Sequence, residues 1–176
     1  MSKHYWRQAN ASLTALTSDS RAKILGALAK SNPLLAARLR ALDWNALTEH
    51  VLCDAMASVA KDASWAFTKE PKAMLPSNLQ LSQDKILAVV SSGNLYVVAS
   101  RATSGSVTFH MGRYDGRYKE DNPVEWSKLE ALKKDIEQAY VVKAVEAMAK
   151  LIGQEVSTTK SKGGKTVIKA KVKVGQ

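Results

Sequence analysis

Six lysines near the end of the chain, all within residues 160–173, are the side chains best suited to binding a charged partner. They are Lys160, Lys162, Lys165, Lys169, Lys171 and Lys173. Ammonium groups at this density can neutralise the phosphates of a nucleic acid, and such contacts add affinity without reading base sequence. The pattern also has a structural explanation, because natural sheets place lysines on edge strands to prevent pairing with another chain. Two interpretations therefore stand, a phosphate-binding strand and a protected edge.

The segment "KTVIKAKVKV" at residues 165–174 alternates strictly between two kinds of residue. Because successive side chains of a strand point to opposite faces, one face would carry mainly apolar residues, and the other would carry Lys169, Lys171 and Lys173. The preceding "QEVSTTK" has strand character as well, and a glycine-containing turn at Ser161–Gly164 would join the two. We therefore expect the chain to end in a β-hairpin with a row of lysines on one face.

A second candidate site is "RYDGRYK", which interleaves basic and aromatic residues. Its relevant members are Arg113, Tyr114, Arg117 and Tyr118. Cations beside aromatic rings can hold a single-stranded nucleic acid through charge and base stacking. Two tyrosines at alternate positions can equally cap the core of a sheet. The segment is therefore a candidate for nucleic-acid binding with a structural alternative.

Residues suited to catalysis or metal binding are few. His50, Cys53 and Asp54 would share one face of a helix, but a tetrahedral metal site needs further ligands, and Cys53 alone is more typical of a small buried residue. No glycine-rich phosphate loop, hydrolase elbow or paired-cysteine motif is present. We predict no catalytic residue, no metal and no cofactor.

The composition is that of a basic globular protein. The 176 residues carry a formal net charge of +10, and residues 153–176 contribute half of it with six lysines and one glutamate. A single cysteine excludes an internal disulfide. No stretch of about 18 apolar residues is present, which excludes a spanning helix and a secretory signal. We expect a cytoplasmic protein without a membrane partner.

The pattern of apolar residues predicts three parts. Residues 1–70 read as a helical region, because apolar residues recur at helical spacing and Asn32-Pro33 and Asp43 are N-terminal helix signals. Residues 71–84 contain prolines and no sustained period, as is typical of a linker. Residues 85–176 read as an α+β domain.

Within this last part, "KILAVVSS", "LYVVAS" and "SVTFHMG" are separated by turn residues and predict a three-stranded meander. Asn122-Pro123 opens a long helix that Gly153 would end. The predicted fold class is α+β, with an N-terminal helical bundle followed by an antiparallel sheet. That sheet would consist of the meander and the C-terminal hairpin, and it would pack against one long helix.

Three segments of this half carry a resemblance to a known family. They are "YDGRYK" at Tyr114–Lys119, "IEQAYVVKAVEAMAKLIGQEV" at Ile136–Val156 and "KGGKTVIKAKV" at Lys162–Val172. In their order and spacing they resemble the Ycf thirty-five family of plastids and cyanobacteria, with relatives in bacteria and phages. The resemblance implies a similar fold for about half of the chain. It carries no settled activity, and it has no counterpart in residues 1–70.

Two functions follow from these features. The first is a small basic accessory protein, here expected to be phage-encoded, that binds DNA or RNA non-specifically through the C-terminal lysines and "RYDGRYK". The second is a protein–protein interaction module, structural subunit or inhibitor that docks through its helical N-terminal region, with the basic strand against an acidic protein surface. Trp6, Trp44, Trp65 and Trp126 would suit such an interface, although burial is the commoner outcome for tryptophan. The distribution of charge favours nucleic acid.

Overall fold

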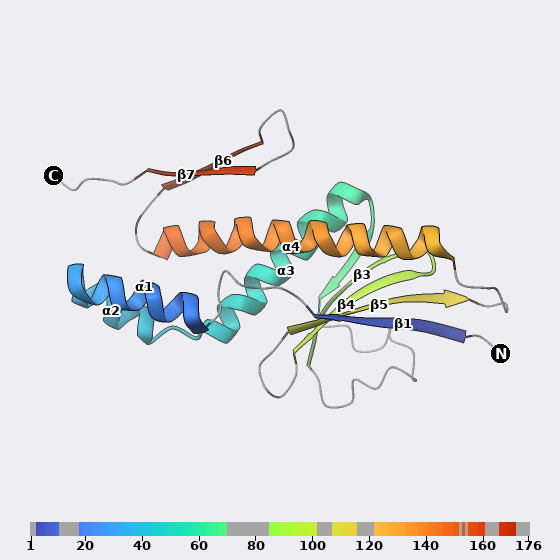
Figure 1. Cartoon of the computed structure of the whole chain (residues 1–176), viewed down its shortest axis with the longest axis horizontal. Helices are drawn as coiled ribbons and strands as arrows, with labels where there is room; N and C mark the ends of the chain where they lie inside the picture. Colours follow the sequence, from blue (N-terminus) through green and yellow to red (C-terminus); the bar gives the residue numbers. More distant parts are fainter. Residues whose placement is uncertain are drawn as a thin grey trace. The chain divides into compact units, whose positions relative to one another are not determined.

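The computed structural model in Figure 1 describes residues 3–10, 18–69, 85–101, 107–115, 122–151, 153, 155–160 and 166–171. Helices and strands both occur throughout these ranges, which confirms the α+β class. In chain order the elements are β1 (Lys3–Asn10), α1 (Ser18–Ser31), α2 (Pro33–Arg40), α3 (Trp44–Ala63), β2 (Ala66–Lys69), β3 (Lys85–Ser92), β4 (Leu95–Arg101), β5 (Val107–Asp115), α4 (Pro123–Leu151), β6 (Glu155–Lys160) and β7 (Thr166–Lys171).

The larger sheet is antiparallel, and its strand order is β1-β5-β4-β3-β2. Its three central strands are consecutive in the chain, which confirms the predicted meander. The first turn is the two-residue loop Gly93–Asn94, where Gly93 has a φ of +57°, as the first position of a tight hairpin turn with glycine requires. A bulge at Leu87 shifts the β3–β4 register between Ile86 and Ala88.

The prediction that residues 1–70 are helical is wrong at both ends. Lys3–Asn10 forms β1, which pairs along its whole length with β5, as Figure 1 shows. Its sequence, "KHYWRQAN", lacks the alternation of apolar and polar residues that marks a half-buried strand. The strand is therefore identified only by its pairing with β5. At the other end, Ser64 adopts a φ of +60° and stops α3, after which β2 pairs with β3.

Between these strands the predicted helical region is confirmed as α1, α2 and α3, and side-chain caps explain where two of these helices begin. Asn32 Oδ1 accepts the N–H of Leu35 at 3.1 Å, and Pro33 follows it at the first helical position. Asp43 Oδ1 accepts the N–H groups of Asn45 and Ala46, both at 3.0 Å. These caps satisfy backbone donors that have no partner inside the helix, and so they set the first residues of α2 and α3.

The long helix α4 is confirmed with its predicted start and end. Asn122 caps it, and Gly153, with a φ of +73°, donates its N–H to the Lys150 carbonyl at 3.1 Å. Several residues spaced three to four apart, or multiples of these, along α4 are fully or almost fully buried: Leu129, Leu132, Ile136, Tyr140 and Ala149. The helical period of these apolar residues therefore defines the buried side of α4.

The C-terminal hairpin is confirmed, but not as part of the larger sheet. β6 and β7 pair antiparallel and form a separate two-stranded sheet. The expectation of one sheet combining the meander and the hairpin is therefore wrong. Alternation along a strand shows that it has two different faces, but it does not show which strand lies beside it.

The chain divides into two compact units whose boundaries fall inside α3 and α4. One, here called the sheet unit, comprises Met1–Ser12 and Leu52–Ala139, and the other, the hairpin unit, comprises Leu13–Val51 and Tyr140–Gln176. Neither unit follows the predicted boundaries of 1–70 and 85–176. The linker predicted at residues 71–84 lies outside the described residues.

Two glycines allow a direct test of backbone conformation. A Cβ at Gly26, inside α1, or at Gly93, in the β3–β4 turn, would meet no atom within 4 Å, so the two sites differ mainly in φ. We expect Gly26→Ala to stabilise the protein by about 0.5–1 kcal/mol, because alanine favours the helix. Gly93→Ala should destabilise it by about 1–2 kcal/mol, because L-residues disfavour positive φ.

Urea unfolding followed by circular dichroism would measure both changes against the unsubstituted protein. Shifts of the midpoint in the same direction for the two variants would contradict the assigned backbone conformations.

Candidate functional site

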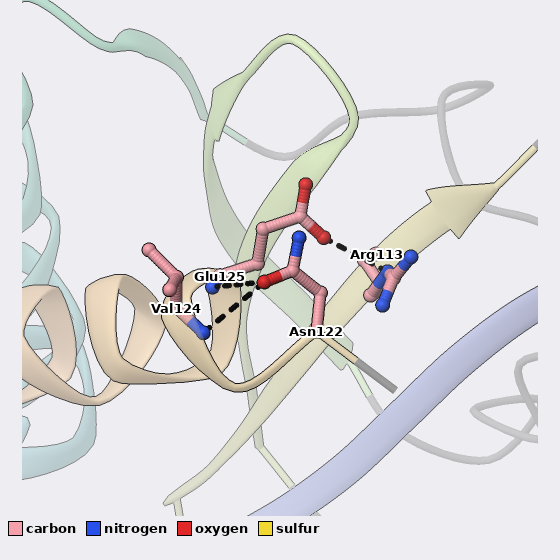
Figure 2. Close-up of polar contacts among 4 residues, drawn as sticks. All are labelled: Arg113, Asn122, Val124 and Glu125. Atoms are coloured by element: carbon pink, nitrogen blue, oxygen red, sulfur yellow. Dashed lines mark hydrogen bonds and ion pairs between the residues drawn. The ribbon is translucent and has the colours of Figure 1, made fainter. Parts of the chain in front are cut away.

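Arg113, which the sequence suggested as a nucleic-acid contact, lies near the end of β5 and is buried, with 3% of its surface exposed. Its Nε is 3.0 Å from Oε2 of Glu125, whose side chain is 22% exposed. Figure 2 shows the glutamate side chain reaching from the first turn of α4 toward the strand. The pair therefore joins β5 to α4 within the sheet unit.

The start of α4 determines where this carboxylate lies. Asn122 Oδ1 accepts the N–H of Val124 at 3.1 Å and that of Glu125 at 3.4 Å, as Figure 2 shows. This cap sets the first turn, and an anionic side chain in a first turn also interacts favourably with the helix dipole. The cap and the ion pair thus act on the same turn.

The prediction that Arg113 contacts phosphate is therefore corrected. A guanidinium that is buried and paired with a carboxylate would have to break that pair to reach a ligand, and a buried charge left without its partner is costly. Of the other residues in "RYDGRYK", Tyr114 is registered against His4 of β1. Arg117 and Tyr118 lie outside the described residues.

The hairpin register shows where the lysines of β6 and β7 lie along the strands. Lys169 is opposite Ser157, Lys171 is opposite Glu155 and Lys160 is opposite Thr166. Ser157 and Thr159 are both exposed, and they share one face of β6 because they are two residues apart. Directly paired residues lie on the same face of a sheet, so this face also holds positions 169 and 171. Lys160 belongs to the opposite face, and Lys162, Lys165 and Lys173 lie outside the described residues.

The two-stranded form of this sheet bears on both interpretations of the lysines. In the part of the chain that the structure describes, β7 pairs with β6 alone, so its other side is an edge. Lysines suit an edge strand because they discourage pairing with another chain. They are equally suited to contacting phosphates there. The two interpretations differ in a measurable property, because only the phosphate-binding strand predicts salt-dependent binding of nucleic acid.

The structure also brings together Ser100 and His110, which the sequence gave no reason to connect. Ser100 Oγ lies 3.2 Å from His110 Nε2, and the two come from adjacent strands, since His110 pairs with Val98. A serine hydrogen-bonded to a histidine is the arrangement of an activated nucleophile. Ser100 is fully buried, however, so a substrate could not reach its hydroxyl, and we assign the pair a structural role. The register of β4 and β5 was the missing information.

Two further sequence interpretations concern buried residues. Cys53 is buried, and its Sγ lies 3.8 Å from the Leu87 carbonyl oxygen, which confirms it as a small core residue. Among the described residues, no group of three or more His, Cys, Asp or Glu could hold a metal ion. Trp44 and Trp126 are also buried, so neither offers a free surface to a partner.

Among the residues that the structure describes, no helix has the length and apolar character needed to cross a membrane.

The charge is divided very unequally between the two units. The sheet unit contains 13 Lys/Arg and 11 Asp/Glu, whereas the hairpin unit contains 13 Lys/Arg and only 5 Asp/Glu. The hairpin unit therefore carries +8 of the net charge of +10. Long-range attraction of a polyanion depends on such an excess, and so it should act mainly on the hairpin unit.

Comparison with protein families, curated proteins and solved structures found no match to this chain. No function can therefore be carried over from a relative, and the resemblance to the Ycf thirty-five family stays a prediction.

The buried ion pair can be tested with a double-mutant cycle. We expect Arg113→Met to destabilise the protein by about 2–3 kcal/mol, because it leaves the Glu125 carboxylate without its cation. Combined with Glu125→Gln, the loss should be smaller than the sum of the two single losses, by roughly 1–2 kcal/mol. Urea unfolding of all four proteins gives this difference.

The matched control is the ion pair between Lys133 and Glu137 on α4, 3.4 Å apart and one helical turn from each other. The corresponding cycle there should give only about 0.3–0.5 kcal/mol, as is usual for a pair on one helix. Equal coupling energies for the two pairs would mean that the buried Arg113–Glu125 pair stabilises the protein no more than an ion pair within one helix does.

Proposed function

We propose that the protein is a small cytoplasmic accessory protein that binds DNA or RNA non-specifically through its C-terminal hairpin. The observation that carries the proposal is the hairpin register. It aligns positions 169 and 171 with the exposed face of β6 that holds Ser157 and Thr159. Residues 153–176 contain six lysines and a single acidic residue, Glu155. Such a face suits a phosphate backbone.

The types of residue define the kind of recognition. Lysine is a compact, flexible point charge, whereas arginine offers a planar fork for bidentate contacts. The hairpin has lysines and no arginine, so it is suited to contacting phosphates and not to reading bases. Tyr114, Arg117 and Tyr118 stay in the proposal as contacts to a single strand, while Arg113 is removed because it is buried and paired.

The test is binding of labelled single-stranded and duplex DNA and RNA by fluorescence anisotropy, at about 50 and 200 mM salt. The variant carries Lys169→Gln, Lys171→Gln and Lys173→Gln. Each lost phosphate contact should lower the slope of log K against log salt by about 0.7–0.9, so we expect the slope to fall by roughly 2–3.

A control variant loses the same charge from exposed lysines of the sheet unit, through Lys61→Gln, Lys128→Gln and Lys134→Gln. Its slope should match that of the unsubstituted protein. Absence of binding to all four nucleic acids at low salt would reject the proposal. A salt-insensitive, stoichiometric complex with another protein would instead favour the alternative of an interaction module.

A further inference from the structure

The helical pair α1–α2 is strongly basic. Its two helices, Ser18–Ser31 and Pro33–Arg40, contain five cations and one acidic residue, Asp19 in the first turn of α1. The five are Arg21, Lys23, Lys30, Arg38 and Arg40. Four of them are exposed, while Arg21 is half-buried, with its guanidinium 5.5 Å from the centre of the Trp44 ring. The four exposed cations are available to a ligand, and Arg21 serves the packing of α1 near the start of α3.

On α1 the two exposed lysines lie on one side of the helix. Lys23 and Lys30 are seven residues apart, which is close to two turns, so they are separated by about 10 Å along the helix axis. Gly26 and Ala27 lie between them and are exposed as well. Because these two residues are small, a ligand that contacts both lysines meets no large side chain on the way.

On α2 the two arginines lie on either side of the exposed face. Ala36 and Leu39 are buried, and this sets which side of α2 faces inward. Residues two apart on a helix point in different directions, so Arg38 and Arg40 flank the outward side, with Ala37 between them. The Trp44 indole N–H donates to the Leu39 carbonyl at 3.0 Å and holds the end of α2 near the start of α3. The arginines thus project from a fixed backbone.

The tertiary structure also groups these helices with the lysine-rich hairpin. Both belong to the hairpin unit, although more than a hundred residues separate them in the chain. The helical pair supplies the arginines that the hairpin lacks. A guanidinium can make two parallel hydrogen bonds to one phosphate, which an ammonium group cannot.

We propose that the four exposed cations of α1–α2, namely Lys23, Lys30, Arg38 and Arg40, provide a second binding surface for the phosphate backbone of the nucleic acid that the hairpin binds. The inference rests on the proposed function and extends it from one surface to two. A single nucleic acid that spans both surfaces makes more phosphate contacts than the hairpin alone provides, and so its binding depends more steeply on salt.

A structural role for the same residues makes a different prediction. Lys30, Arg38 and Arg40 lie in the last turns of their helices, where cations interact favourably with the helix dipole. If this were their only role, their removal would lower the stability of the protein and leave the nucleic-acid affinity of the folded protein unchanged. Stability and binding are therefore measured on the same samples.

The experiment compares variants of the full chain by anisotropy with labelled single-stranded and duplex DNA and RNA. The helix variant carries Lys23→Gln, Lys30→Gln, Arg38→Gln and Arg40→Gln. The hairpin variant carries Lys169→Gln, Lys171→Gln and Lys173→Gln. The control variant removes four exposed lysines of the sheet unit through Lys61→Gln, Lys69→Gln, Lys128→Gln and Lys134→Gln. Circular dichroism verifies that each is folded at the temperature of the assay.

The helix variant should bind at least roughly tenfold more weakly at about 50 mM salt, with a salt slope reduced by about 3–4, whereas the control variant should bind as the unsubstituted protein does. A variant with Arg38→Lys and Arg40→Lys should keep the slope, because it keeps the charges.

Failure of the inference and failure of the proposed function give different results. Unchanged binding by the helix variant together with weakened binding by the hairpin variant would overturn the second surface alone. Weakened binding by the helix variant with no effect of the hairpin variant would support the surface on α1–α2 and reject the hairpin as the binding site. Equal losses for the helix and control variants would show that only total charge matters, and no nucleic-acid binding by the unsubstituted protein would overturn both proposals.

Discussion

The central strands of the larger sheet are buried on both faces, and the rest of the sheet unit follows from this constraint. Leu87–Val90 on β3 and Val97–Ser100 on β4 are runs in which every residue is buried, so neither face of these strands meets water. Backbone N–H and C=O groups in such a place need partners within the protein. β4 finds them in β3 and β5, and those two strands find their outer partners in β2 and β1.

This need for partners explains the two strands that lie at the edges of the sheet. Neither "KHYWRQAN" nor "AFTK" has a strong strand pattern, yet each forms a ladder with a neighbour that has one. Pairing with a buried strand can outweigh a weak local preference, because an unpaired backbone group in the core costs more than a poor β-propensity. Lys3–Asn10 and Ala66–Lys69 are strands for this reason.

The structure also divides the cations into two groups with different roles. Arg113 is buried against Glu125 and helps to join β5 to the start of α4. The exposed cations of α1–α2 and the lysine positions of the hairpin belong to the unit that holds most of the net charge. A basic residue beside an aromatic one, as in "RYDGRYK", therefore has two possible uses. Burial decides between them, because a paired guanidinium in the core is not available to an outside phosphate.

The sequence by itself determined the α+β class, the starts of α2, α3 and α4, the end of α4, the meander and the C-terminal hairpin. Each of these depends on residues close together in the chain, such as Asn32 before Pro33, Asn122 before Pro123, or the glycine at position 153. Only the tertiary structure decided that β1 and β2 complete the sheet, that the hairpin forms its own sheet, that Arg113 meets Glu125, and that α1–α2 belongs with the hairpin. The physical reason is that these features depend on which distant segments come together. Local propensities and spacing do not encode strand partners, whereas the burial of apolar surface and the pairing of every buried polar group select them for the whole chain.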